Sequence, residues 1–257
     1  MNAHIQSMSR VQSSMTASTP AGLVLYPPGS ALLGAGAVLV WNDVEKQGRD
    51  QFYQWHDKEH IPERLAIPGF RRGRRYGRRG HSPEWLTMYE ADDLGVVVSP
   101  EYLERLNSPT PGTVKTLQYF RNTSRAVCRV VCSIGSSTGG HVLAMRLDVP
   151  AAQSDAMCRY LSMEVFPRAA ALTGVVACHL YTADQPASHL NTAESSTREF
   201  DVPSWVLLVE ASTPGAAEQA RTLIDGPELQ RLGVIVRSDA AIYSLEICRL
   251  AMPATAS

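Results

Sequence analysis

The chain contains an internal repeat, and this feature limits its possible folds more than any other. In the first part of the two segments, residues 105 positions apart match: Trp55 with Tyr160, Glu59 with Glu164, Pro62 with Pro167, Gly69 with Gly174 and Tyr76 with Tyr181. Further on the spacing becomes 120, and the matches are Trp85 with Trp205, Glu90 with Glu210, Cys128 with Cys248 and Arg129 with Arg249. The identities are few, but their order is kept over about 95 residues, which favours duplication over chance. The change of spacing falls in the polar stretch 184–203, where we expect an enlarged loop in the second copy.

Each copy is predicted to run strand, helix, strand, strand, helix, strand. In the first copy, hydrophobic patterning predicts strands at 37–41, 70–76, 85–90 and 126–131, and helices over 43–59 and 100–106. Pro62 is expected to stop or kink the first helix, and Pro68-Gly69 to form a turn. In the second copy we expect strands at 142–147, 205–210 and 241–248, and a helix over 216–224 that 227–232 extends.

This order of elements is that of the ferredoxin-like βαββαβ unit, one antiparallel sheet with helices on one face. The other face of the sheet has to be covered, and two such sheets packed face to face would cover each other. The sequence therefore predicts an α+β protein in which two ferredoxin-like repeats form a pseudo-dimeric α+β barrel in one chain. The expected parts are a largely disordered leader (1–33), a first, site-bearing repeat (34–133), a linker (134–140), a second, degenerate repeat (141–250) and a tail (251–257).

Composition and charge argue against several kinds of partner. Lys and Arg number 24 against 25 Asp and Glu, for a net charge of −1, so a whole-chain attraction to nucleic acid or to an acidic membrane is not expected. No apolar stretch approaches the length of a membrane span, and Pro27-Pro28 ends the only run that resembles a secretory signal. The five cysteines include no C-x-x-C pair, which favours a reducing compartment. We expect a cytoplasmic protein that binds a small molecule, with a homodimer as one option for its assembly.

The first third of the chain resembles a known family. Its segments are GAGAVLVWNDV at 34–44, WHDKEHIPERLAIPGF at 55–70 and GRRY at 73–76. The string aromatic-x-x-x-E-H-x-P-x-R-L-x-x-P-G-F is similar to that of the EthD-like branch of the dimeric α+β barrel superfamily. The second copy resembles this family only in its scaffold. The resemblance implies the barrel fold, but it leaves the activity broad, because the superfamily includes cofactor-free monooxygenases, polyketide cyclases, lactone isomerases and haem-binding members.

Residues 56–64 are the main candidate for a site. His56 and His60 lie four residues apart and so share a helix face, and a neutral imidazole suits a general base near pH 7. The second copy keeps the scaffold positions but replaces three polar ones: His56, His60 and Arg64 become Leu161, Val165 and Ala169. This pattern predicts a site that the first copy keeps and the second has lost. The alternative is structural, with His60 placed at the carboxyl end of the helix, where its charge suits the dipole.

The arginine cluster is the strongest charge feature of the sequence: Arg71, Arg72, Arg74, Arg75, Arg78 and Arg79. On a strand, Arg72, Arg74, Tyr76 and Arg78 would point one way, and Arg71, Arg75 and Arg79 the other. One of these faces is expected to reach a cavity, where guanidinium groups could bind a carboxylate, enolate or phosphate. The alternatives are an exposed, ion-paired hairpin and a nucleic-acid patch, and the second is disfavoured because only Tyr76 interleaves with the arginines.

In the enzyme interpretation, His60 moves a proton, Arg74 or Arg72 steadies the developing oxyanion, and Tyr76 donates a hydrogen bond. The predicted catalytic residues are His60, Tyr76 and Arg74, and the predicted substrate-binding residues are His56, Glu59, Arg64, Arg72, Trp41 and Trp85. The aromatic residues Trp41, Trp85, Tyr89, Tyr119 and Phe120 either line this pocket or pack in the core. No cofactor and no metal site is expected. The chemistry would be cofactor-free oxygenation, isomerisation or cyclisation of a small aromatic or lactone-like molecule.

Three other interpretations stay open at this point. The first is a non-catalytic small-ligand-binding or interaction protein. If the duplication mainly builds an interface, His60 and the arginines should face bulk solvent, with no enclosed cavity. A haem-binding barrel needs an axial histidine, for which His60, His141 and His179 are candidates. Residues 56–60 also match the H-x-x-E-H pattern of a class of zinc proteases, but the sequence offers no obvious third ligand. The glycine-rich stretch 136–140 precedes a strand, so we interpret it as the linker and not as a phosphate cradle.

Overall fold

The structure, a computed structural model, describes residues 30–195, 201–237 and 240–252. The first copy supplies four strands, β1 (Gly36–Val44), β2 (Phe70–Gly77), β3 (Trp85–Ala91) and β4 (Phe120–Gly135). Its helical elements are η1 (Lys46–Gly48), α1 (Arg49–Trp55), the π-helical turn η2 (His56–His60), α2 (Ile61–Leu65), η3 (Val96–Val98), α3 (Pro100–Asn107) and α4 (Pro111–Leu117).

The second copy repeats this plan with additions. Its strands are β5 (His141–Asp148), β6 (Val175–Ala183), β7 (Trp205–Ala211), the short β8 (Ile235–Val236) and β9 (Ala241–Leu250). Its helical elements are η4 (Ala151–Gln153), α5 (Ser154–Arg159), the π-helical turn η5 (Tyr160–Val165), α6 (Phe166–Ala170), α7 (Gln185–Ser188), α8 (Pro214–Ile224) and α9 (Pro227–Arg231).

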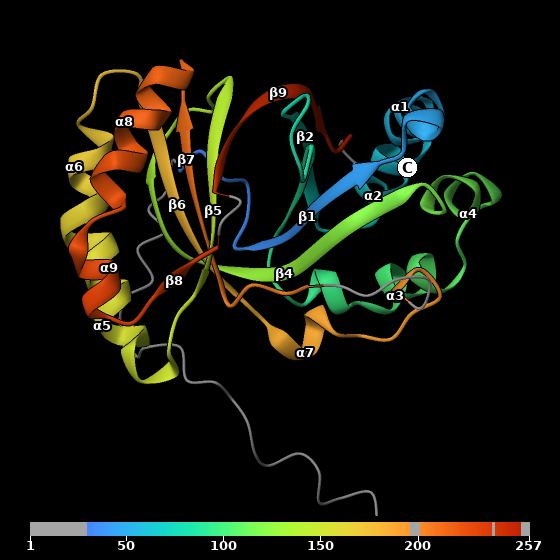
Figure 1. The fold of residues 1–257 in the computed structure, drawn as a ribbon. Helices are drawn as coiled ribbons and strands as arrows, with labels where there is room; N and C mark the ends of the chain where they lie inside the picture. The colour runs from blue at the N-terminus through green and yellow to red at the C-terminus, as the bar shows by residue number, and fades with distance from the viewer. Residues whose placement is uncertain (1–29, 196–200, 238–239, 253–257) are drawn as a thin grey trace, which may run out of the picture.

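The strands close into one antiparallel barrel with the helices outside it (Figure 1). Around the barrel the order is β7-β6-β4-β1-β3-β2-β9-β5, and β5 pairs back onto β7, while β8 adds to β5. Each copy contributes a four-stranded ferredoxin-like sheet, and the pairs β2–β9 and β4–β6 join the two sheets. The predicted α+β class and pseudo-dimeric barrel are therefore confirmed. Within the described ranges no helix is long and apolar enough to cross a membrane.

One continuous helix runs from Arg49 to Leu65, and it differs from the expected one at both ends. It begins later, because Asp43 and Val44 still pair with β4 as part of β1. Pro62 does not end it, because the helix continues through α2. A proline lacks the amide N–H and its ring crowds the carbonyl four residues back, and the wider π-helical turn just before it relieves both problems. The second copy has the same arrangement, η5 followed by Pro167, so the π-helical turn belongs to the scaffold.

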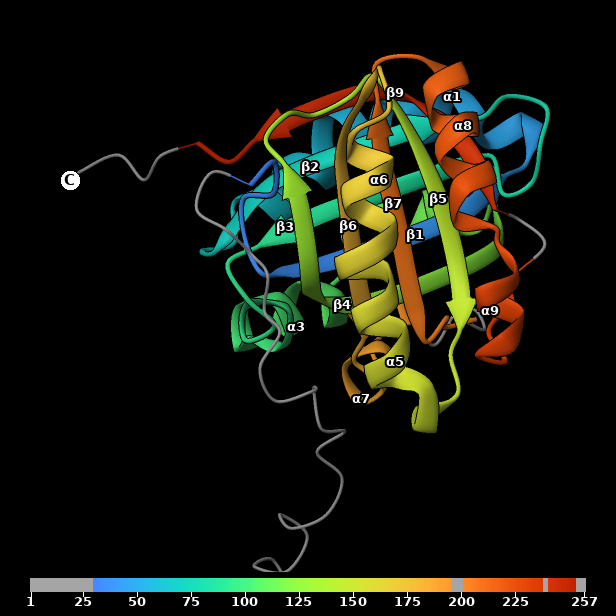
Figure 2. The same cartoon turned by 90° about the vertical axis from the view of Figure 1, so that its left-hand side faces the viewer.

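The helix layers of the two copies pack differently. In the second copy the space between sheet and helices is filled by one continuous apolar cluster, and Figure 2 shows α6 and α8 lying across the outer face of β5, β6 and β7. In the first copy the same space holds two separate clusters. One lies around Ile61, Phe70 and Tyr89, the other around Phe52 and Trp85. The first layer is therefore divided where the second is continuous.

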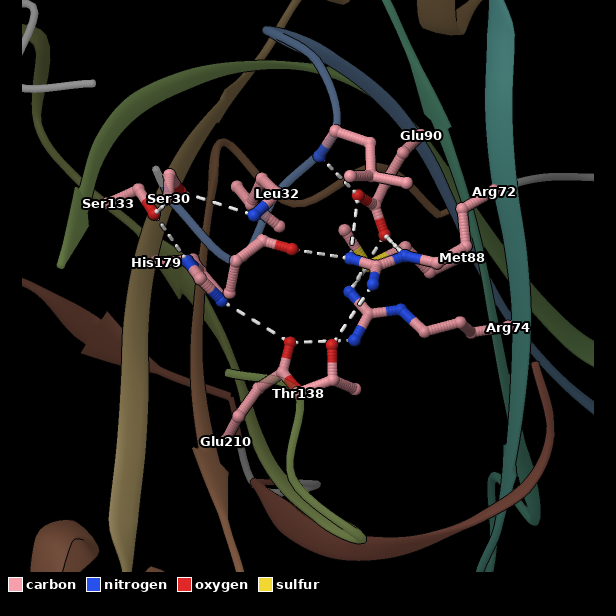
Figure 3. A network of polar contacts seen from close by, with 12 residues as sticks. Ser30, Leu32, Arg72, Arg74, Met88, Glu90, Ser133, Thr138, His179 and Glu210 are labelled. Atoms are coloured by element: carbon pink, nitrogen blue, oxygen red, sulfur yellow. Dashed lines mark hydrogen bonds and ion pairs between the residues drawn. The ribbon is translucent and has the colours of Figure 1, made fainter. Parts of the chain in front are cut away.

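The barrel interior is closed by side chains and contains buried charges (Figure 3). The guanidinium of Arg74 is fully buried between Glu90, at 2.9 Å, and Glu210, at 2.7 Å. Arg72 adds a second ion pair to Glu90, at 2.8 Å, and His179 lies 3.3 Å from Glu210. Arg74 and His179 are corresponding positions of the two copies, as are Glu90 and Glu210. The network therefore follows the internal symmetry and ties the copies together.

The described end of the predicted leader, around Ala31, and the predicted linker both contact this network. Residues 1–29 and 253–257 lie outside the described residues, but Ala31 is buried, donates its N–H to the carbonyl of Gly135 at 3.0 Å and accepts from Arg72 at 2.7 Å. In the linker, the N–H of Gly139 donates to Glu210 at 2.8 Å, and the hydroxyl of Thr138 accepts from Arg72 at 3.0 Å. Both segments thus help to seal the barrel interior.

Candidate functional site

A cavity of about 60 Å³ lies in the helix layer of the first copy. It is lined by residues of both apolar clusters that divide this layer. Its polar lining consists of Asn42, His56, His60, Arg64, Thr87, Arg125 and Glu194, and its aromatic walls are Trp55, Tyr89, Tyr102 and Phe120. A buried water needs about 10–15 Å³ measured in this way, so the cavity has room for roughly four waters.

The second copy has no comparable opening at the matching positions among its described residues. Leu161, Val165 and Ala169, which correspond to His56, His60 and Arg64, are at most 1% exposed and belong to its continuous apolar cluster. The helix, its π-helical turn and its proline are otherwise alike in the two copies. The same scaffold therefore carries a polar cavity in one copy and a filled core in the other.

His60 is half-buried and stands among aromatic rings at the cavity. Its ring centroid lies 4.2 Å from that of Trp55, 5.7 Å from the stacked ring of His56, and 6.1 Å from Tyr89, which it meets edge-on. Because the helix continues to Leu65, His60 lies within the helix and not at its carboxyl end. The alternative role as a helix cap is therefore wrong.

His56 is held in one tautomer by its neighbours. Arg75 lies on the helix side of β2 and donates from Nη1 to Nδ1 of His56 at 3.0 Å. Since a guanidinium can only donate, Nδ1 carries no proton, and the proton sits on Nε2, 3.5 Å from the hydroxyl of Thr87. Burial, and then the positive charge of Arg75, hold the pKa of His56 well below its ordinary value of 6.5. His56 is thus a neutral, fixed group that supports the ring of His60.

Arg64 forms a buried ion pair with Glu194, a residue of the second copy. Burial is the strongest single influence and opposes the charge of Arg64. The electrostatic interactions with Glu194 and, to a smaller extent, Tyr102, Glu63 and Tyr89 together outweigh it and raise the pKa of Arg64 above its ordinary value. The guanidinium also lies over the ring of Tyr102, 5.7 Å from its centroid. Arg64 is therefore a permanent, oriented positive charge in the cavity wall.

The enlarged loop expected in the second copy supplies part of this wall. It leaves the sheet through α7, where the hydroxyl of Ser188 accepts the N–H of Val127 at 2.9 Å. It then returns toward α3, where the N–H of Glu194 donates to the carbonyl of Leu106 at 3.1 Å. The segment therefore contacts the first copy, and the cavity is built from both copies.

The three predicted catalytic side chains do not form one site, and this is a correction. Arg74, Tyr76 and Arg72 project into the barrel interior, on the opposite face of the sheet from His60, as does the predicted substrate-binding residue Trp41. The strand alternation grouped these residues correctly, but Arg75 belongs to the face that reaches the helix layer. The arginine of this strand that contacts His56 is therefore Arg75 and not Arg74.

The other predicted residues divide between the cavity and its surroundings. His56, His60 and Arg64 line the cavity together. Trp85 lies on the helix side but packs against Phe52, with 5.0 Å between ring centroids, and does not line the cavity. Glu59 turns away from it and accepts a hydrogen bond from the hydroxyl of Thr110. Of the aromatic candidates, Tyr89 and Phe120 line the cavity. The polar lining residues that sequence reasoning missed are Asn42, Thr87, Arg125 and Glu194, and it also missed the aromatic residues Trp55 and Tyr102.

The residues present do not fit a haem. The cavity beside His60 is far smaller than the several hundred Å³ of a cofactor pocket. His179 lies inside the barrel, with its ring nitrogens 2.9 Å from the Ser133 hydroxyl and 3.3 Å from Glu210. His141 lies 3.2 Å from the hydroxyl of Ser244 at the join of β5 and β9. No described group of three or more His, Cys, Asp or Glu side chains is arranged to hold a metal ion, and His56 uses Nδ1 to accept from Arg75.

Comparisons with known proteins bear on the fold alone. No protein-family model and no curated protein matches the sequence. Among solved structures, an anthrone oxidase-like protein is similar with a TM-score of 0.58 and 14% identity, over 89% of this chain and 98% of the other. A chlorite dismutase variant from Candidatus Nitrospira defluvii gives a TM-score of 0.53 and 10% identity, over 83% and 92%. A "putative monooxygenase" from Fusobacterium nucleatum gives 0.50 and 9%, over 86% and 95%.

These neighbours define the class of the fold. The chain has the dimeric α+β barrel fold, with both halves of the barrel in one polypeptide. At 14% identity or less, the likeness carries no substrate, cofactor or site residue from one protein to another.

Proposed function

We propose that this chain is an enzyme that moves a proton on a small aromatic or lactone-like molecule held in the first-copy cavity, without a bound cofactor. One observation carries the proposal: the scaffold is duplicated, yet only the first copy replaces its aliphatic packing with His56, His60 and Arg64 around a cavity. Buried polar groups cost stability, so their concentration at one of two equivalent places argues for a use. Two structural neighbours, an anthrone oxidase-like protein and a "putative monooxygenase", support the proposal of a small-molecule enzyme.

In this proposal His60 is the general base. It takes a proton from a phenol or from a carbon next to a carbonyl group, and the neutral His56 ring stacked on it adds no competing charge. The resulting phenolate or enolate is stabilised by Arg64, with Tyr89 as a hydrogen-bond donor. Return of the proton to another carbon gives isomerisation, attack on a carbonyl of the same molecule gives cyclisation, and reaction with dioxygen gives oxygenation.

The EthD-like resemblance belongs to this proposal as well. Its motif covers Trp55, His60, Pro62 and Arg64, and two of these, His60 and Arg64, are polar groups of the cavity. A single aromatic ring needs a cavity of about 150 Å³, so such a substrate has to displace lining side chains as it enters. Changes of side-chain rotamer of this kind are common on binding.

The test is turnover of a panel of aromatic ketones, phenols and lactones, followed by His60→Gln. Glutamine keeps a similar size and polarity but cannot act as a base, so we expect kcat to fall by about 10²–10⁴ with an unchanged circular dichroism spectrum. His141→Gln, a histidine on the far side of the barrel, should leave kcat unchanged. Turnover that survives His60→Gln would show that the base has been assigned wrongly.

A second candidate function is non-catalytic binding of a small ligand in the same cavity. The observation in its favour is that His56 and Arg64 are both fixed by ion-pair or hydrogen-bond partners, which suits recognition as well as catalysis. Tight binding of a panel member that is released unchanged, in wild type and in His60→Gln alike, would favour this function over the enzyme.

A further inference from the structure

We infer that the ligand of the first-copy cavity is a small aromatic monoanion whose oxyanion binds between Arg64 and Tyr89. This inference rests on the cavity being the functional site, as proposed above, but it concerns recognition and does not depend on His60 acting as a base. Its ligand class is a carboxylate, or a phenolate or enolate, attached to a flat ring. Three independent features of the cavity support it.

The first feature is a pair of buried donors that the described residues leave unused. Nη2 of Arg64 is occupied by Glu194, but Nη1 has no hydrogen-bond partner within the described part of the chain. The same holds for the hydroxyl of Tyr89, and both side chains are almost wholly buried and line the cavity. Burial raises the pKa of Tyr89, so its hydroxyl keeps its proton and can donate. Two buried donors without hydrogen-bond partners lower the stability of the folded protein. We therefore infer that the ligand brings an acceptor for them.

The second feature is the charge of the lining. Two arginines, Arg64 and Arg125, and one glutamate, Glu194, line the cavity, and His56 is neutral. The guanidinium of Arg125 donates hydrogen bonds to the hydroxyl of Tyr102, at 3.2 Å, and to a backbone carbonyl. No carboxylate among the described residues pairs with it. Counted over these described side chains, the lining carries one more positive than negative charge. A ligand with a single negative charge would balance it, whereas a cation would meet net repulsion.

The third feature is the fixed direction of the Arg64 guanidinium. Glu194 holds one terminal nitrogen, and the ring of Tyr102 lies against the guanidinium, with 5.7 Å to its centroid. Arg64 lines the cavity, and its other terminal nitrogen has no partner among the described residues. The aromatic walls of the cavity include Trp55, Tyr102 and Phe120, which suit the faces of an aromatic ring. Glu194 is thus a positioning residue, supplied by the second copy for a ligand that the first copy binds.

The test is calorimetric titration of the full-length chain near neutral pH with four probes: acetate, benzoate, 4-nitrophenolate and uncharged benzamide. Benzoate and benzamide have nearly the same shape, so their comparison isolates the charge. We expect benzoate to bind at least 10-fold more tightly than benzamide and than acetate, which lacks the ring. If benzoate alone binds, the ligand class is a carboxylate. If 4-nitrophenolate alone binds, the class is a phenolate or enolate.

Two variants connect this binding to the named donors. Tyr89→Phe removes only a hydroxyl that has no partner among the described residues, so this variant should fold normally. Its affinity for the anion should be about 10-fold lower than that of the wild type. Arg64→Met should weaken it 100-fold or more, and the double variant Arg64→Met/Glu194→Met removes both charges if the single one fails to fold. Arg221→Met, on an exposed pair of the second copy, is the matched control and should bind as wild type.

The outcomes separate this inference from the proposed function. Catalysis is tested by His60→Gln and anion recognition by the Arg64 and Tyr89 variants, so failure of catalysis alone would leave anion recognition standing. Equal binding of benzamide and benzoate, unchanged benzoate affinity in Arg64→Met, or absence of binding by both aromatic anions would overturn the inference. A His60-dependent turnover of an uncharged lactone in that case would leave the proposed function intact.

Discussion

Arg74 of the first copy and Glu210 of the second form an ion pair inside the barrel, with 2.7 Å between Nη1 and Oε1 and at most 1% of either side chain exposed. The pair joins sheets that are more than a hundred residues apart in the chain. A buried pair of this kind adds little net stability over apolar packing, but removal of one partner strands the other in a medium of low dielectric constant. The network is therefore easy to break by a single substitution.

Arg74→Met is expected to lower the free energy of unfolding by about 3–5 kcal/mol, because it leaves Glu90 and Glu210 buried without their common cation. Urea unfolding followed by circular dichroism measures the loss. The control is Arg221→Met, which breaks an exposed pair with Glu218 and should cost no more than about 1 kcal/mol. Equal losses in the two variants would contradict the structural role given to Arg74.

The carboxyl group of Glu210 predicts a specific dependence of stability on pH. Burial alone would raise its pKa, but the hydrogen bond with His179 and the charge of Arg74 lower it from 4.5 to about 2. The unfolded chain therefore binds this proton more readily than the folded protein does. The contribution of Glu210 to the free energy of unfolding is complete above about pH 4.5 and is lost as the pH falls toward 2. The stability gap between wild type and Glu210→Gln should therefore narrow over that range in urea titrations. A gap that stays constant would show that Glu210 is not ionised in the folded protein.

His56 predicts a second dependence, at higher pH and with a different origin. Since its pKa in the folded state lies well below 6.5, the unfolded chain takes up the proton first as the pH falls below 6.5. Stability is then lost at up to about 1.4 kcal/mol per pH unit. His56→Gln keeps an acceptor for Arg75 but does not titrate, so its stability should fall less steeply between about pH 6.5 and pH 5. Parallel curves for the two proteins would contradict the neutral state assigned to His56.

The apolar helix layer of the second copy predicts a loss of stability that comes from packing and not from charge. Leu161, the counterpart of His56, is fully buried, so Leu161→Ala should cost about 2–5 kcal/mol of unfolding free energy. Met163 lies in the same π-helical turn and is 60% exposed, and Met163→Ala should change stability by less than about 0.5 kcal/mol. Thermal and urea unfolding of the pair of variants provide the measurement. A small loss in Leu161→Ala would mean that the second layer is not tightly packed.

Much of the fold could be predicted from the sequence, because the duplication displays every scaffold position twice. Pro62 and Pro167 mark the same π-helical turn, and Gly69 and Gly174 both adopt positive φ, +92° and +87°. The start of the first helix was missed because Asp43 and Val44 carry no mark that separates a strand end from a helix start. Such boundaries are decided by pairing with Phe120 and Arg121 on a distant strand.

The site was only half predictable, for a reason of geometry. Alternation along β2 shows that Arg72 and Arg74 share a face, but it does not show which face meets the helices. The same holds for β1, where Trp41 faces the barrel interior and its neighbour Asn42 faces the cavity. The sequence alone does not show which of the two faces the helices. Glu194 could not be found at all, because its place depends on how an inserted segment of the second copy folds back onto α3. A comparison of the copies, in contrast, correctly placed His56, His60 and Arg64 together.

The pairs β2–β9 and β4–β6 make a single polypeptide out of what two identical chains would otherwise form. In an assembly of identical subunits every substitution appears twice, so a hollow introduced for chemistry weakens both halves at once. Fusion removes that coupling. Here the second copy, with its continuous apolar layer, stabilises the barrel. Its inserted segment supplies Glu194 to the cavity of the first copy. The two halves of this barrel can therefore differ in their packing, whereas two identical subunits always carry the same residues.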